Sequence, residues 1–255
     1  MRRGNFKVRI LIGLAIVAFA FIRRCSQQET NPYTGRTQAI SLSPEQEIAI
    51  GLQSAPGMAQ QHGGLHPNNQ YQALVDQVGN KLVNHSLAKN TPYKYEFHLL
   101  ADENTINAFA LPGGQIFITY ALFSQLQNED QLAGVLGHEI GHVLGKHSNE
   151  RITDSKYWQT LVMGAGAIDM GSVAQQIGNG TLLKNGRDDE LESDELGVIF
   201  MMDAGYNPEE MIGVMEILKA AAGPNRAPEM QSTHPDPENR IEKIREAIAK
   251  HKKAS

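Results

Sequence analysis

The sequence predicts a mostly helical α+β domain with one small antiparallel sheet. Apolar residues recur at helical spacing from residue 121 almost to the end of the chain. Residues 93–120 instead alternate or form short β-rich runs, as half-buried strands do. A helix-start signal at Ser43 and Pro44 precedes both regions. One domain is therefore expected over residues 43–255, after a separate N-terminal segment.

The first 25 residues have the pattern of an export signal. Basic residues occur within positions 2–9, and an uncharged apolar run follows over positions 10–22. This run is short for a membrane-crossing helix and typical of a signal peptide. Residues 18–20 (AFA) fit a cleavage site, whereas Arg23 and Arg24 are equally consistent with an uncleaved signal-anchor. Both interpretations export the rest of the chain, because the basic end stays in the cytoplasm.

Composition excludes several other classes of protein. The chain has 255 residues, of which 41% are hydrophobic and 20% are charged, enough for one substantial core. The net charge of -5 argues against nucleic-acid binding, which usually needs a basic surface. The single cysteine, Cys25, excludes an internal disulfide. Two arginines precede it where a lipid-attachment signal needs small residues, so the sequence disfavours lipidation there.

Helices are expected on either side of a glycine- and histidine-rich loop at residues 62–68. Residues 26–42 are polar, contain turn residues and are expected to form a linker or an extended arm. Ser43, followed by Pro44 and acidic residues, predicts the start of the first helix. A second helix is expected over residues 69–88, where apolar residues share one face.

The small sheet is expected within residues 93–120. Residues 93–100 alternate between apolar and polar side chains, and residues 106–111 and 115–120 are short β-rich runs. Residues 112–114 (PGG) between the last two runs predict a tight turn. Two or three antiparallel strands are therefore expected.

The helical remainder of the chain should break where glycine, asparagine and proline gather. These places are residues 178–180, residues 205–208 and residues 224–237. No internal repeat accompanies these breaks, so the helices are expected to belong to a single domain.

The stretch GHEIGHVLGKH, residues 137–147, predicts a metal site. His138 and His142 are four residues apart, so both imidazoles lie on one face of a helix and can reach one tetrahedral zinc ion. Glu139 lies beside the first histidine, where it can take a proton from zinc-bound water. His147 is five residues beyond His142 and off that face, so it is expected to be structural.

The helix that carries this motif has recognisable ends. Asn128 or Asp130 is expected to begin it, and Gly145 to end it. Two histidines at this spacing also occur on ordinary helices, so a catalytic site requires a third protein ligand.

Residues 188–197 (DDELESDELG) offer that ligand. Glu190 and Asp194 are four residues apart and share a helical face, so one carboxylate can bind zinc while the other supports a ligand imidazole. Glu192 points about 200° away from Glu190 and competes with it for the ligand role. An acidic run is otherwise commonly a solvated helix face. Here it continues into residues 196–206, an amphipathic segment whose inner face must be buried.

Four stretches occur in a characteristic order: INAFALPGGQIFI (106–118), HEIGH (138–142), ELESD (190–194) and STHPDPENRI (232–241). Together they resemble the membrane-associated zinc metallopeptidases that include HtpX, the CAAX prenyl protease and the periplasmic BepA and LoiP proteases. NPYTGRTQ (31–38) is similar to a segment that precedes the catalytic domain in periplasmic and mitochondrial members. The resemblance covers most of residues 31–250.

The resemblance implies a zincin-type metallopeptidase domain whose small antiparallel sheet lies beside the active-site helix. It implies one zinc ion per chain, bound by two histidines and one glutamate: His138, His142 and Glu190. Glu139 is the implied general base. Asp194 matches the aspartate that supports a ligand histidine, which favours Glu190 over Glu192 as the third ligand.

The resemblance also implies residues around the mouth of the site. His234 belongs to a His-Pro loop and either caps the zinc or approaches the substrate oxyanion, with Arg240 nearby. The strand after the PGG turn is implied to be an edge strand that pairs with an extended substrate. Its candidate substrate-binding residues are Gly113, Gly114, Gln115 and Ile116.

These features predict a zinc-dependent endopeptidase that cleaves extended or misfolded envelope proteins in protein quality control. One alternative is an assembly or binding module that keeps zinc for structure and has latent proteolytic activity. Another is a cytosolic helical protein with a chance motif, which requires that the N-terminus does not direct export.

The predicted location is the periplasm, with residues 10–22 either removed or retained as an inner-membrane tether. The expected partners are protein or peptide substrates and, through a retained tether, the membrane; no nucleic acid is expected and the oligomeric state stays open. Single-domain exported members of the LoiP type fit better than members with several membrane spans or a helical repeat array. The chain has at most one apolar segment of that kind, and no repeat follows residue 250.

Overall fold

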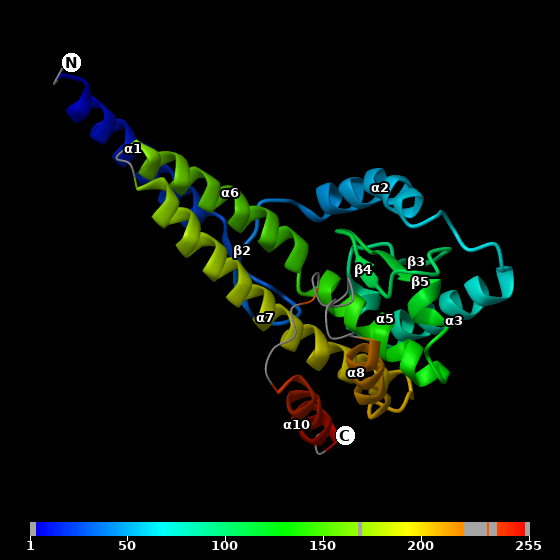
Figure 1. Ribbon diagram of the computed structural model, residues 1–255. Coiled ribbons are helices and arrows are strands. Elements are labelled where there is room, and N and C mark those ends of the chain that lie inside the picture. Colours follow the sequence, from blue (N-terminus) through cyan, green and yellow to red (C-terminus); the bar gives the residue numbers. More distant parts are fainter. Residues whose placement is uncertain (1–3, 168–169, 222–233, 235–238, 253–255) are drawn as a thin grey trace. The chain divides into compact units, whose positions relative to one another are not determined.

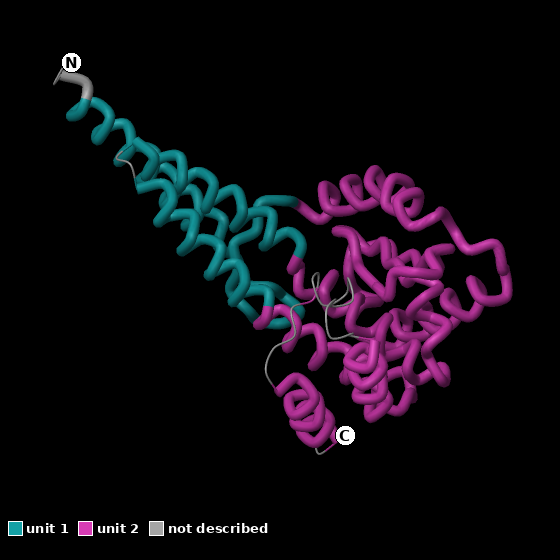
Figure 2. Tube along the Cα trace, in the orientation of Figure 1, with its two compact units in different colours: residues 1–42, 148–186 teal, residues 43–147, 187–255 magenta. Residues whose placement is uncertain are grey.

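The computed structural model describes residues 4–167, 170–221, 234 and 239–252 and is mostly helical (Figure 1). The chain divides into two compact units, which Figure 2 colours separately. Unit 1 comprises residues 1–42 and 148–186, and unit 2 comprises residues 43–147 and 187–255. The predicted α+β class is confirmed. Residues 148–186 group with the N-terminal residues, and the limits of the catalytic domain stay a prediction.

Three helical segments and a β-hairpin build unit 1. They are α1 (Gly4–Ser26), the antiparallel strands β1 (Gln28–Thr30) and β2 (Thr37–Ala39), α6 (His147–Gly166) and the first part of α7 (Gly171–Asp203). Within the described ranges, no helix combines the length and the apolar content needed to cross a membrane.

The hairpin of β1 and β2 occupies the segment predicted to be a linker or extended arm. Asn31 is buried at the turn, where its side-chain oxygen accepts hydrogen bonds from two backbone N–H groups at 2.9 and 3.3 Å. Asn149 of α6 accepts hydrogen bonds from the N–H groups of Ser41 and Leu42 at 3.1 and 3.2 Å. These side-chain contacts order a stretch whose polarity alone predicts a loop.

Helix α7 runs without interruption through residues 178–180, where the sequence predicts a break. Gly178 lies against the indole of Trp158 on α6, and an added Cβ would come within 2.9 Å of that ring. The glycine therefore permits close packing of two helices and does not end either one.

The predicted break at residues 205–208 is confirmed. α7 ends at Asp203, Gly205 has a φ of 73°, and α8 (Glu210–Ala221) begins after this turn. Glycine adopts such a left-handed φ without the steric cost of a Cβ. The third predicted break, at residues 224–237, lies outside the described residues apart from His234.

Unit 2 is built around one small sheet and one buried helix. Its strands are β3 (Glu96–Leu100), β4 (Ala108–Ala110) and β5 (Gln115–Thr119). Its helical elements are α2 (Pro44–Gln61), α3 (Asn69–His85), the 3-10 turn η1 (Leu87–Asn90), α4 (Tyr120–Phe123), α5 (Glu129–Leu144), α8, α10 (Arg240–Lys252) and the end of α7. The predicted pattern of two helices, a sheet and a helical remainder is present.

The ends of α2 and α5 follow their sequence signals. Ser43 caps α2 by accepting a hydrogen bond from the N–H of Gln46, whose side chain accepts one from the N–H of Ser43 at 2.9 Å. This reciprocal arrangement satisfies two donors that the helix itself leaves unpaired. Asn128, rather than Asp130, caps α5 by accepting a hydrogen bond from the N–H of Gln131 at 2.9 Å, and Gly145 ends that helix.

The strands of unit 2 form a mixed sheet in the order β3-β5-β4, rather than a wholly antiparallel one. β4 and β5 form the predicted hairpin around residues 112–114 and pair antiparallel, with Phe109 opposite Phe117. β3 pairs with the other side of β5 in parallel, because the loop at residues 101–107 and the hairpin turn each reverse the chain once. β5 is consequently the central strand.

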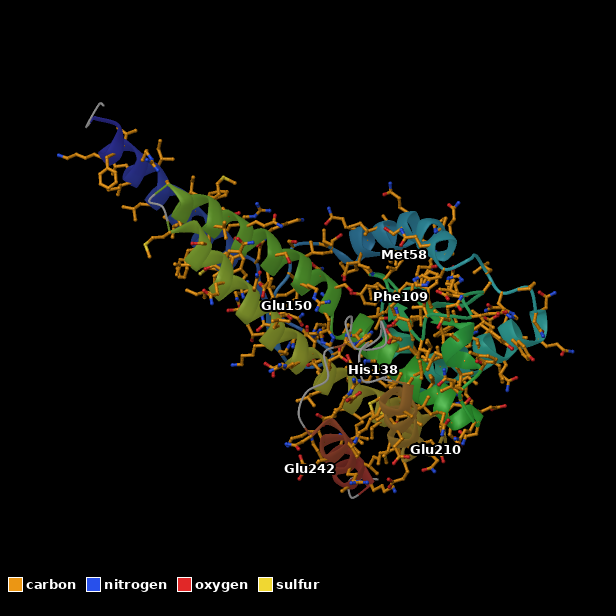
Figure 3. All side chains as sticks on the ribbon, in the orientation of Figure 1. Met58, Phe109, His138, Glu150, Glu210 and Glu242 are labelled. Carbon is orange, nitrogen blue, oxygen red and sulfur yellow. The ribbon has the colours of Figure 1, made fainter. Side chains whose placement is uncertain are left out.

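Helix α2 packs on this sheet. Leu100, Phe109 and Phe117 form a buried cluster, and Met58 of α2 packs against it; Figure 3 labels Met58 and Phe109. Gly113, at the hairpin turn, lies against the backbone of α2 and has a φ of 84°. Both the close contact and the left-handed conformation require glycine at this position.

Helix α5 is buried along nearly its whole length and contacts α3, α8, β4 and β5. The side chains of Asn128 and Gln131 donate hydrogen bonds to Glu210 of α8, at 3.2 and 3.0 Å. Gly141 allows α7 to approach, since an added Cβ would lie 3.0 Å from the backbone of Ser193. This close approach brings side chains of α5 beside those of α7.

Candidate metal centre and active site

Four side chains meet where α5 and α7 approach each other. His138 and His142 come from consecutive turns of α5, Glu190 comes from α7, and His234 comes from the segment between α8 and α10. One donor atom of each lies within 4.8 Å of the others, and Figure 3 labels His138. These are the residues that the sequence predicts as zinc ligands and as the zinc cap. Imidazoles and a carboxylate are donors that zinc binds in proteins.

The donor atoms are spaced as a small tetrahedral site requires. Nε2 of His138 and Nε2 of His142 are 3.0 Å apart, and the oxygens of Glu190 lie 3.3 Å from each. Nδ1 of His234 lies 3.0 Å from Glu190 and 3.1 to 3.4 Å from the other two imidazoles. Donors at about 2.0–2.1 Å from a tetrahedral zinc ion are about 3.3 Å from one another. The residues therefore fit the ion.

A buried ion pair supports His138. Nδ1 of His138 lies 2.9 Å from Oδ1 of Asp194, which leaves Nε2 directed at the cluster. Arg240 donates to Asp194 through Nε at 2.7 Å and through Nη2 at 2.9 Å. Partners of this kind fix the tautomer and the orientation of a metal-binding imidazole. Arg240, predicted among the catalytic residues, is buried, pairs with Asp194 and also lies 3.4 Å from Oε2 of Glu190.

A second chain of hydrogen bonds supports His142. Nδ1 of His142 lies 2.8 Å from Nδ1 of His147, and Nε2 of His147 lies 2.7 Å from Oε2 of Glu192. With Nε2 of His142 facing the cluster, its Nδ1–H donates to His147, and Nε2–H of His147 donates to Glu192. Glu192 therefore supports the site from behind and does not compete with Glu190.

The sequence prediction misses this role of His147 because it assumes a continuous helix. α5 ends at Leu144, and Lys146 has a φ of 55°, which turns the following residue back toward the helix. Gly145 lies directly against the ring of His147, so only a residue without a side chain leaves room for it. A histidine placed just after a helix-ending glycine is the signal that the sequence contains.

Glu139 is fully buried beside the cluster. Neither of its carboxylate oxygens has a hydrogen-bond partner among the described residues. The nearest charged or titratable contact is Nε2 of His234, at 3.6 Å from Oε1. A buried carboxylate without a partner costs free energy, and a metal-bound water is a donor that would satisfy it.

Burial and neighbouring charges shift the pKa values of the cluster in opposite directions. Burial lowers the pKa of His138, but Asp194 and Glu190 outweigh it and raise the pKa to about 9. Burial lowers the pKa of His142 to about 3, against the attraction of Glu190. Burial raises the pKa of Glu190, yet the neighbouring histidines hold it well below the ordinary value. Glu190 and His142 are thereby held in the forms that bind a cation, an ionised carboxylate and a neutral imidazole, whereas His138 releases its proton when it binds a metal.

The four residues predicted to bind substrate are buried in the fold: Gly113, Gly114, Gln115 and Ile116. Ile116 pairs with Phe97 of β3 on one side and with Ala110 of β4 on the other. The prediction that this strand is an edge strand is therefore wrong, since β5 is central. Of the two edge strands in the described sheet, β4 is the one that contacts α5.

Two histidines on one helical face, a buried glutamate beside the first and a carboxylate from a second helix define a metallopeptidase of the HExxH class. The family model described as Peptidase family M48 matches residues 69–248. The chain belongs to this family and is therefore a metalloprotease, a metal-dependent hydrolase of peptide bonds. The predicted family resemblance and enzyme class are confirmed.

Relatives come from mitochondria and from bacteria. The chain is 33% identical to mitochondrial metalloendopeptidase OMA1 of Schizosaccharomyces pombe over 91% of this chain and 70% of that protein. It is 30% identical to the beta-barrel assembly-enhancing protease of Escherichia coli K12 over 90% of this chain, but it spans only 48% of that protein. It is 27% identical to metalloprotease YcaL of Escherichia coli K12 over 84% of this chain and 85% of that protein.

Proposed function

We propose that the chain is a zinc endopeptidase in which His138, His142 and Glu190 bind one zinc ion and Glu139 is the general base. The strongest support is Glu139 itself, a buried carboxylate beside the cluster that lacks a hydrogen-bond partner in the described part of the chain. A zinc site that served only to stabilise the fold would have no use for such a group, because an unpaired buried carboxylate is destabilising.

The chemistry divides between the ion and the side chains around it. Zinc held by these residues would lower the pKa of its water to about 7 and polarise the substrate carbonyl. Glu139 is placed to accept a proton from the attacking water and to pass it to the leaving amine. Asp194 and His147 hold the two ligand imidazoles through their Nδ1 atoms, so that both Nε2 atoms keep their direction throughout the reaction.

We propose that His234 holds the enzyme in a closed form. Its Nδ1 lies 3.0 Å from Glu190 and its Nε2 lies 3.6 Å from Glu139, in the space that the attacking water needs. A catalytic zinc requires one open coordination position. His234 must therefore move away before hydrolysis. The closed form then corresponds to the alternative of an assembly module with latent activity, as the resting state of the same enzyme.

The proposed substrates are extended or misfolded proteins of the cell envelope, cleaved in protein quality control. Likeness to the beta-barrel assembly-enhancing protease supports an envelope role. The basic N-terminus and the apolar run of residues 10–22 support export to the periplasm. In this proposal α1 is either removed on export or kept as an inner-membrane tether.

Glu139→Gln tests the proposal most directly. The variant should keep its zinc, measured by elemental analysis, and lose casein cleavage by at least about 100-fold, because general-base catalysis contributes about 10²–10⁴. Glu129→Gln, an exposed glutamate in the first turn of the same helix, is the matched control and should keep full activity. Full casein cleavage by the Glu139 variant would eliminate the mechanism and favour the binding-module alternative.

The ligand set needs its own test. Glu190→Gln should lose zinc, whereas Glu195→Gln, a half-buried glutamate on the same helix that pairs with Lys250, should retain it. Zinc retention in both variants would remove Glu190 from the ligand set. The role of Glu139 is tested separately by the cleavage assay.

A further inference from the structure

We propose that the helical hairpin formed by residues 157–167 and 170–183 of unit 1 inserts into one leaflet of a phospholipid bilayer beside α1. This inference rests on the proposed export and tethering of the chain and adds a second membrane-contacting segment. Unit 1 holds 13 of the 17 large hydrophobic side chains that are exposed among the described residues. Apolar exposure on this scale marks a contact surface.

All three helices of unit 1 contribute an uncharged stretch. These stretches are residues 10–22 of α1, residues 157–166 of α6 and residues 171–183 of α7. The sequence between Lys156 and Lys184 contains a single charged residue, Asp169, which falls between the helices and outside the described residues. A soluble hairpin of this length would ordinarily carry charged residues on its outer faces.

Contacts between α1, α6 and α7 join these uncharged stretches within unit 1, which is teal in Figure 2. An added Cβ on Gly13 of α1 would lie 2.8 Å from the carbonyl oxygen of Gly164 on α6. A cavity of about 240 Å³ is lined entirely by apolar residues and glycine from all three helices, including Leu14, Ala165 and Ile177. Close contacts at glycine and small residues are typical of helices that pack in lipid.

The exposed side chains face outward in several directions. On α1, Leu11, Ile12 and Leu14 are all more than half exposed, although they point to different sides of the helix. On the hairpin, Met163 is 66% exposed and Ile177 is 56% exposed. A second protein would cover one face, whereas a bilayer covers every outward face of the bundle. The distribution therefore favours lipid.

Basic and aromatic residues mark the base of the uncharged region. Arg23 of α1 and Lys156 of α6 line the same small cavity. Lys184 follows the uncharged stretch of α7, whose Leu182 lines a cavity with Trp158. No ion pair involves these three basic side chains in the described parts of the chain. Cations beside an aromatic ring suit the headgroup level of a membrane with anionic lipids.

The length of the hairpin sets its depth. From Lys156 to the end of α6 at Gly166 the helix rises about 15 Å, which is half of the hydrocarbon core of about 30 Å. The hairpin thus reaches the middle of the bilayer and does not cross it.

A fluorophore placed on the hairpin tests this insertion in the full-length chain. Cys25→Ser removes the one cysteine, so Val173→Cys can carry a nitrobenzoxadiazole label on the hairpin and Gln77→Cys can carry it on the exposed face of α3. With vesicles of phosphatidylcholine and phosphatidylglycerol, the label at position 173 should shift to the blue and be quenched by nitroxide-labelled acyl chains. The label at position 77 should stay accessible to aqueous iodide.

Two outcomes would overturn the insertion. One is a label at position 173 that remains open to iodide while the chain is bound to vesicles. The other is a blue shift that needs no lipid and grows with protein concentration, which would assign the surface to a second copy of the chain. Val173→Glu combined with Ile177→Glu should abolish the acyl-chain quenching of the adjacent label at Met170→Cys and leave casein cleavage unchanged. Casein cleavage therefore reports on the proposed function separately from the insertion.

Discussion

Replacing His147 tests whether its hydrogen bond to the candidate ligand His142 strengthens zinc binding. His147→Phe keeps an aromatic ring against Gly145 but removes the nitrogen that accepts from Nδ1–H of His142. With zinc on Nε2, His142 cannot change its tautomer, so its buried N–H loses its partner at a cost of about 1–3 kcal/mol. Supporting partners of this kind change metal affinity about 10- to 100-fold. We expect zinc to bind about 10- to 100-fold more weakly, equal to about 1.4–2.8 kcal/mol.

The assay is competition between the purified metal-free protein and a chromophoric zinc chelator. His147→Gln supplies an amide oxygen as an acceptor and should recover part of the affinity. His85→Phe, an exposed histidine at the end of α3, should change nothing. A zinc affinity within about twofold of the unaltered protein in His147→Phe, with an unchanged circular dichroism spectrum, would refute the reasoning, since the supporting hydrogen bond would then contribute less than the expected change of about tenfold.

Three further variants test two contacts at the site and one contact elsewhere in unit 2. Gly141→Val should push α7 away from α5 and reduce both zinc content and the free energy of unfolding, the latter by about 1–3 kcal/mol, measured by urea titration. Arg240→Met leaves Asp194 buried without its cation and should lower the free energy of unfolding by about 3–5 kcal/mol, again by urea titration. Burial raises the pKa of Asp102, but the hydrogen bond with His62 and bonds from its own turn outweigh it and lower the pKa to about 2. A carboxyl group with a lowered pKa stabilises the fold at pH values above its ordinary pKa of 3.8. This stabilisation is lost as the pH falls through the folded-state pKa of about 2. Asp102→Asn should therefore be less stable by about 1–2 kcal/mol at pH 6, with a difference that closes toward pH 2; a constant difference across that range would contradict this account.

Local sequence signals predict the elements of unit 2 well. The helix ends at Ser43, Asn128 and Gly145 each depend only on residues within four positions of the cap itself. The local sequence is therefore sufficient to predict them. The same holds for the pair His138 and His142, whose common face follows from helical geometry alone.

Features that depend on distant contacts escape this kind of prediction. Strand order is one, since nothing within residues 115–119 tells that β3 occupies the far side of β5. Gly178 is another, because a glycine that admits the ring of Trp158 looks the same in the sequence as one that ends a helix. The role of His147 requires both the positive φ of Lys146 and the carboxylate of Glu192 on a different helix.

Residues 148–186 interrupt unit 2 as an insertion, and the proposed ligands stand on both sides of it, with His142 before the insertion and Glu190 after it. An ion bound by both residues closes this loop as a covalent cross-link would. It restricts the chain at the two crossings, which are the points where the chain passes from one unit to the other, near residues 147 and 187. Chelation should therefore loosen the two crossings before either unit unfolds, with faster amide hydrogen exchange at residues 143–147 and 187–194. The ion that activates water would then also stabilise the chain segments at which the insertion joins unit 2.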